Sequence, residues 1–167
     1  HDTVQIQRAW DALDSAEQLV PEVAFEAAER LLAHGGAADI SRQWLLPIWD
    51  AMLQKYEALT LAQRVRLARV LERGFAAPDG APDAAWLSRI ESAQMGNPRD
   101  AVLQYLAGVV CMRLSLWGKS QQLFKQSLAV LEDSELARDT WLALAQMAEQ
   151  RQDAVAAAQA YREAAKK

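Results

Sequence analysis

Apolar residues recur three and four positions apart over most of the chain, a spacing that is typical of amphipathic helices. Ile6, Trp10 and Leu13 show it first and predict a short helix near the start. A second apolar series begins after Pro21 and stops at Gly35, which is expected to end a helix. Followed along the whole chain, the pattern predicts roughly ten helices and no strand.

Residues with special backbone preferences predict where several helices begin and end. Pro47 lacks a backbone N–H, so we expect it to end or kink the helix that carries Trp44. Thr60 and Asp83 precede apolar series and are expected to cap helices. Residues 76–82 are rich in Pro, Gly and Ala and predict a loop, which is too short to link two domains.

Two stretches, 101–132 and 137–167, repeat one spacing of small and bulky residues. In each, twelve positions separate a small residue of a first helix from a small residue of a second, and an aromatic residue follows four later. This is the pattern W-x2-L-G-x2-Y, then A-x3-F, of the tetratricopeptide repeat (TPR). The first stretch has Gln104, Ala107, Gly108, Cys111, Ser120 and Phe124, and the second has Trp141, Leu144, Ala145, Ala148, Ala157 and Tyr161.

The spacing has a packing reason. Gly108 and Ser120 are expected where two antiparallel helices approach most closely, because a large side chain there would push the pair apart. Phe124 and Tyr161 are expected to fill the space between successive pairs. A single pair cannot bury its apolar face alone, so its neighbours must stack on it. The predicted fold is all-α, a right-handed α-α superhelix of TPR-like helix pairs.

The predicted organisation is one TPR-like helical domain over residues 1–167. Within it, 3–58 forms degenerate helix pairs and 60–98 forms another degenerate pair, ahead of the two clearer repeats. Ala28 and Ile40 show the same separation of twelve, with Trp44 four later, and therefore suggest a third pair in the register of the other two.

Composition and charge narrow the function classes. The chain is 51% hydrophobic with 7 Gly and 5 Pro, which favours helices. The net charge of −4 and the absence of a dense basic cluster argue against nucleic acid as a partner. No run of 18 apolar residues occurs, so no membrane-spanning helix is expected. The chain begins with His1 rather than Met, which suggests a fragment and leaves a membrane anchor upstream open.

Catalytic and metal chemistry are not expected. Two His and one Cys cannot supply a metal cluster, and no nucleophile–base set stands out. Cys111 and Met112 could suggest haem ligation, but Cys111 occupies a core position of the repeat, so buried packing is the favoured interpretation. His34 is interpreted as a residue at the end of a helix, and Trp117 as a packing residue beside a turn.

The first helices of stacked pairs line a concave groove, which is the predicted partner-binding site. A mixed apolar and polar face of this kind suits a helix or an extended peptide. It lacks the Lys and Asn pattern of repeats that clamp a terminal carboxylate. The predicted groove residues are Tyr105, Val109, Met112, Arg113, Asp139, Leu142 and Gln146.

Three segments resemble the C-terminal region of HemY proteins, a family of proteobacterial inner-membrane proteins with TPR repeats. They are Asp83-Ala-Ala-Trp-Leu-Ser-Arg-Ile-Glu91, Asn97-Pro-Arg-Asp-Ala-Val-Leu103 and Leu116-Trp-Gly-Lys119. The resemblance implies a role in a late step of protoheme synthesis. It also implies an anchor of two transmembrane helices upstream, and a repeat domain on the cytoplasmic face of the bacterial inner membrane.

The preferred hypothesis is therefore a non-enzymatic scaffold that binds other proteins, including haem-synthesis enzymes, without a cofactor. Two alternatives remain open. One is a haem or porphyrin carrier, and the other is a general TPR adaptor unrelated to haem. Membrane contact is expected only through the missing N-terminal anchor.

Overall fold

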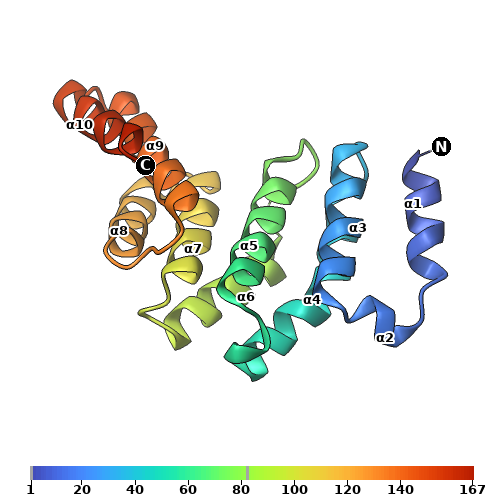
Figure 1. Cartoon of the computed structure of the whole chain (residues 1–167). Coiled ribbons are helices and arrows are strands. Elements are labelled where there is room, and N and C mark those ends of the chain that lie inside the picture. Colours follow the sequence, from blue (N-terminus) through green and yellow to red (C-terminus); the bar gives the residue numbers. More distant parts are fainter. Residues whose placement is uncertain (1, 82) are drawn as a thin grey trace. The chain divides into compact units, whose positions relative to one another are not determined.

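The computed structural model describes residues 2–81 and 83–167, coloured along the chain in Figure 1. The described residues form ten α-helices and one short 3-10 helix, and they contain no strand. The all-α prediction is therefore confirmed. Internal contacts divide the chain into two compact units, His1–Pro82 and Asp83–Lys167, which are described separately as unit 1 and unit 2.

Unit 1 is arranged around one central helix, α3. Its elements are α1 (Asp2–Asp11), α2 (Ser15–Gln18), α3 (Pro21–Ala33), α4 (Ala38–Gln54), the 3-10 helix η1 (Tyr56–Ala58) and α5 (Leu61–Ala76). α3 contacts α1, α4 and α5, and α4 also contacts α5. Phe25 on α3, Leu45 on α4 and Leu71 on α5 are fully buried. These three helices therefore share one apolar core.

Two helices of unit 1 begin as the sequence predicts. Pro21 is the first residue of α3, where its missing N–H costs no hydrogen bond. The Thr60 hydroxyl accepts from the Gln63 N–H at 3.2 Å, and the Gln63 side chain accepts from the Thr60 N–H at 2.9 Å. This reciprocal capping box fixes the start of α5 and confirms Thr60 as its N-cap.

Pro47 does not end a helix, so the part of the prediction that expected a helix end there is wrong. α4 is a continuous helix from residue 38 to residue 54 with Pro47 in its interior. Pro47 is exposed, whereas the neighbouring Ile48 and Trp49 are each 1% exposed. An interior proline costs about 3 kcal/mol. Burial of the apolar face of α4 offsets that cost.

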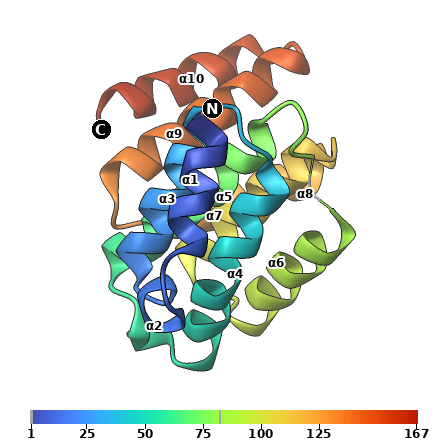
Figure 2. The same cartoon turned by 90° about the vertical axis from the view of Figure 1, so that its right-hand side faces the viewer.

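Unit 2 is built from two tight helix pairs and one preceding helix. Its elements are α6 (Ala84–Gly96), α7 (Ala101–Arg113), α8 (Trp117–Leu128), α9 (Ser134–Gln150) and α10 (Ala154–Ala165). α7 pairs with α8 and α9 pairs with α10, and Figure 2 shows α9 and α10 as neighbouring helices. α6 contacts α7, and α8 contacts α9.

Aspartate caps four of the five helices in unit 2. Asp83, Asp100, Asp133 and Asp153 each accept a hydrogen bond from the backbone N–H three residues later. A cap of this kind satisfies one of the N–H groups that a helix start leaves unpaired. The exception is α8, whose N-cap residue is Leu116 and makes no side-chain cap.

The close approach predicted at Gly108 is present in the α7–α8 pair. The Ser120 hydroxyl donates to the Gly108 carbonyl oxygen at 2.7 Å. A Cβ added to Gly108 would lie 2.7 Å from the Phe124 ring, and Phe124 is fully buried. Gly108 therefore leaves the space that the Phe124 ring occupies, which explains a helix-destabilising residue at this position.

The same turn joins the two helices of three pairs. Gly35, Ser115 and Gln152 have φ angles of +76°, +58° and +62°. The N–H of the next residue donates back to the carbonyl of Leu31, Cys111 or Ala148 at 2.8–2.9 Å, as in a Schellman motif. The small residues of these three repeats are Ala28, Gly108 and Ala145. In each repeat the positive-φ residue lies seven positions after the small residue. The register proposed for the α3–α4 pair is therefore the same as that of the two later pairs.

The boundary between the units lies inside the segment 60–98 that the sequence suggests as one degenerate pair. α5 belongs to unit 1 and α6 to unit 2. The single domain over 1–167 and the subdivision 3–58, 60–98, 101–132 and 137–167 stay predictions.

Candidate partner-binding groove

An open groove of about 780 Å³ lies between α1 and α3 in unit 1. In Figure 1 these two helices run side by side, and contacts join them. α1 and α3 supply nearly all of the lining, and α5 adds one arginine. The lining residues are Asp2, Gln5, Ile6, Ala9, Trp10, Leu13, Glu22, Val23, Glu26, Ala27, Arg30, His34 and Arg66.

The floor of this α1–α3 groove is apolar. On α1 and just beyond it, Ile6, Trp10 and Leu13 face the groove at helical spacing. α3 contributes Val23 and Ala27, one turn apart. Because the two stripes face each other across open space, apolar surface stays available to an incoming apolar side chain.

Trp10 fixes α1 to the rest of unit 1. Its ring stacks on Trp44 of α4, with centroids 4.8 Å apart and planes at 20°, and Trp10 is only 7% exposed. The Gln18 side-chain amide donates to the Trp10 carbonyl oxygen at 3.0 Å. These contacts attach α1 to α4 and to the end of α2.

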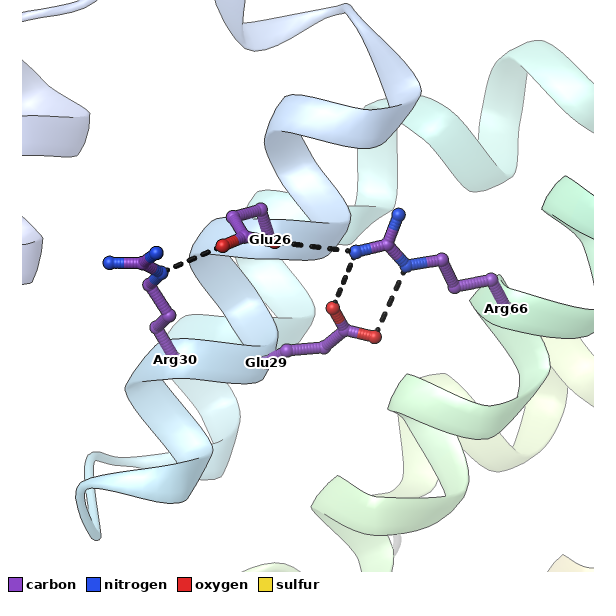
Figure 3. A network of polar contacts seen from close by, with 4 residues as sticks. All are labelled: Glu26, Glu29, Arg30 and Arg66. Atoms are coloured by element: carbon purple, nitrogen blue, oxygen red, sulfur yellow. Dashed lines mark hydrogen bonds and ion pairs between the residues drawn. The ribbon is translucent and has the colours of Figure 1, made fainter.

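A network of ion pairs forms one rim, shown in Figure 3. Arg66 on α5 reaches Glu29 on α3 through two hydrogen bonds, of 2.6 Å from Nη2 and 3.2 Å from Nε. The same guanidinium lies 3.5 Å from Glu26, which accepts at 2.8 Å from Arg30. The bond to Glu29 raises the pKa of Arg66. The network therefore joins α3 to α5 and fixes the direction of the charged side chains.

Two further contacts place charge at the groove. Gln63 donates to Glu22, and this hydrogen bond lowers the pKa of the Glu22 carboxyl. At the other end, His34 Nδ1 lies 3.4 Å from an Asp2 carboxylate oxygen. Acidic and basic side chains therefore both lie beside the apolar floor, an arrangement that suits a partner segment with both apolar and polar side chains.

The structure contradicts part of the predicted groove in unit 2. Tyr105 and Val109 were expected on an open face, but they are 2% and 1% exposed. The reason is the composition of α7, which is apolar on all sides rather than on one. All ten residues 102–111 are buried. A helix that is apolar all round is a core helix.

The remaining predicted residues differ in exposure. Met112, Asp139 and Leu142 are half-buried, whereas Arg113 and Gln146 are exposed. They come from two different helix pairs, α7–α8 and α9–α10.

The structural repeat positions behave mostly as expected. Ala145 and Ala157 are buried, at 0% and 5% exposed, while Trp141 is half-buried. Tyr161 differs from its counterpart Phe124, because it is 40% exposed and its hydroxyl donates to Glu149. The expectation that Tyr161 fills a space between pairs is therefore not met.

Sequence reasoning missed the groove of unit 1, although part of its signal was visible. The stripe of Ile6, Trp10 and Leu13 predicted only one face of a short amphipathic helix, and Ile6 and Leu13 are partly exposed at the groove. The partnership of Arg66 with Glu29 joins residues 37 positions apart, and helical spacing gives no sign of it.

Other candidate groups have structural roles. Cys111 is 1% exposed, which confirms buried packing, and burial raises the pKa of its thiol. Trp117 is 43% exposed, so the packing interpretation accounts for only part of its surface. Within residues 2–81 and 83–167, no group of three or more His, Cys, Asp or Glu could hold a metal ion. No helix in the same ranges has the length and apolar character to cross a membrane.

Comparison with family models, with curated proteins and with solved structures finds no match to this chain.

Proposed function

We propose that the chain is a protein-binding scaffold whose α1–α3 groove receives an amphipathic helix or an extended peptide. The observation that carries this proposal is the apolar floor of Ile6, Leu13 and Val23, which is partly exposed between two helices and bordered by oriented charges. A packed helix pair gains nothing from leaving this surface uncovered, because burial stabilises by about 25 cal/mol per Å². A partner that covers it would gain that free energy.

The proposed architecture is a right-handed superhelix of TPR-like pairs. The shared turns at Gly35, Ser115 and Gln152 support it, because one register in three pairs is typical of a repeat array. Stacked arrays present grooves to peptides without catalytic residues, which agrees with a non-enzymatic scaffold.

The resemblance to HemY proteins supports a more specific proposal. In this version the scaffold acts in a late step of protoheme synthesis at the cytoplasmic face of the bacterial inner membrane, and its partners are haem-synthesis enzymes. A general TPR adaptor unrelated to haem would use the same groove with other partners. The identity of the bound segment separates the two.

Site-specific photo-crosslinking in the native host tests the groove. A photoreactive residue replaces Ala9, which lines the groove, or Val4, which is 45% exposed on the same helix but outside the lining. We expect discrete adducts at position 9, mapping to a segment with apolar residues at helical or alternate spacing. Equal adducts at positions 4 and 9, or none at position 9, would contradict the proposal.

A second variant checks that the apolar floor is what binds. Ala27 is half-buried in the floor, and Ala27→Glu places a charge there. Adducts at position 9 should be lost while the thermal melt stays close to that of the parent. Adducts that persist would show that binding does not use the floor.

A haem or porphyrin carrier is the second candidate, and His34 beside the apolar floor is the observation that favours it. Cys111 is too deeply buried to reach a ligand in the folded chain. A stoichiometric shift of the Soret band on haem titration, lost in His34→Ala and kept in Cys111→Ala, would support the carrier over the scaffold.

A further inference from the structure

An exposed apolar cluster lies at the turn between α7 and α8, in unit 2. Leu114, Leu116 and Trp117 are 38%, 46% and 43% exposed. They surround Ser115, the positive-φ residue of the turn. This set of three side chains, named the apolar turn here, is not part of the α1–α3 groove.

The fold does not require apolar residues at these positions. The α9–α10 pair makes the same turn, and the residues that correspond to Leu114, Leu116 and Trp117 are Arg151, Asp153 and Ala154. Arg151 and Asp153 are polar and Ala154 is small, so the turn forms without large apolar side chains at these positions.

Leu116 stands at a position where a polar side chain could cap the helix start. It is the N-cap of α8 and makes no side-chain cap, whereas Asp153 caps α10 by accepting from the Ala156 N–H at 3.0 Å. Leucine is among the poorest N-cap residues. The sequence thus exposes a leucine at a position where a polar side chain would stabilise the helix start.

Basic side chains flank the apolar turn. Arg113 precedes it and is exposed, and Lys119 follows it with a side chain that is 55% exposed. Lys119 lies 3.5 Å from Glu91, an exposed pair that water screens strongly. Lys119 partly neutralises the negative charge of Glu91.

We propose that the apolar turn inserts into an anionic lipid surface, with Arg113 and Lys119 at the headgroups. Trp and flanking basic residues are typical of the membrane–water interface. Three half-exposed side chains offer much less surface than the roughly 800 Å² that each partner of a stable protein interface buries. A deformable lipid surface needs only a small protruding tip. This proposal is independent of the function proposed for the groove.

Co-sedimentation of the whole chain with lipid vesicles tests the proposal. We expect binding to vesicles of phosphatidylglycerol and phosphatidylcholine, and clearly weaker binding to phosphatidylcholine alone. Trp117→Ser should lower the partition coefficient about tenfold. Val155→Ser, which removes an 80% exposed apolar side chain elsewhere in unit 2, should leave it unchanged.

One variant separates lipid binding from folding. Leu116→Asn supplies a neutral N-cap, so it should melt at or above the temperature of the parent while vesicle binding falls about tenfold. No binding of the parent, or equal binding of parent and both turn variants, would overturn the proposal. Equal binding to the two vesicle types would also overturn it, because the proposal requires an anionic surface.

Discussion

α3 and α7 occupy the same place in their repeats but lie in opposite environments. Both are first helices, both end in the same positive-φ turn, and their small residues Ala28 and Gly108 correspond. α3 presents Glu26 and Arg30 to solvent, whereas the corresponding Leu106 and Val110 of α7 are each 1% exposed. The repeat register therefore fixes the turn and the contact within a pair. The polarity of the remaining faces of each first helix decides whether that helix is exposed to solvent or buried.

The largest expected effect comes from exchanging polarity at one repeat position. Leu106→Glu places a charge in a fully buried site and should lower the free energy of unfolding by about 3–5 kcal/mol. Glu26→Leu, at the corresponding and exposed position of α3, should change it by less than about 1 kcal/mol. Urea unfolding measures both. Similar losses for the two variants would break the comparison.

The next effect concerns the close approach in the α7–α8 pair. Gly108→Ala adds a Cβ 2.7 Å from the Phe124 ring, and the overpacking should cost about 1–3 kcal/mol. Gly118→Ala on α8 is the matched control, because open space surrounds that glycine. Gly118 is the second residue of α8, so Gly118→Ala should leave the free energy of unfolding unchanged or raise it slightly. If calorimetry shows Gly108→Ala melting at or above the parent, the contact is looser than described.

The contact at Gly108 was predictable from sequence, and the open groove was not. Gly inside a helix needs a local reason, and the spacing of twelve to Ser120 pointed to its partner. Exposure of a helix face depends instead on which elements cover it. The sequence of α7 did carry a usable signal, since an all-apolar helix cannot present Tyr105 or Val109 to a partner.

Pro47 and Arg66 show two other limits of sequence reasoning. Pro47 has an unfavourable local effect that the packing of α4 outweighs, and packing is a property of the whole unit. Arg66 pairs with Glu29 across two helices, a contact set by tertiary structure alone. Local propensities therefore located most helices, but they did not identify the charged rim of the groove.

A smaller effect is expected from pH through Asp100, the N-cap of α7. Burial raises the pKa of this carboxyl above its ordinary value. The unfolded chain then ionises at lower pH than the folded one, so ionisation weakens the fold. As pH rises from the ordinary Asp pKa through the raised one, the parent should lose stability relative to Asp100→Asn, which keeps a neutral cap. Relative stability that rises over this window would contradict the assignment.

Thiol accessibility tests the central comparison most directly. Ala27 of α3 and Ala107 of α7 occupy the same repeat position, but Ala27 lines the groove and Ala107 is 4% exposed. In a background with Cys111 replaced by Ala, a maleimide should modify Ala27→Cys readily in the folded chain. Ala107→Cys should react only as fast as the protein unfolds. Equal rates, or faster reaction at position 107, would contradict the assignment of the open face to α3 and the buried face to α7.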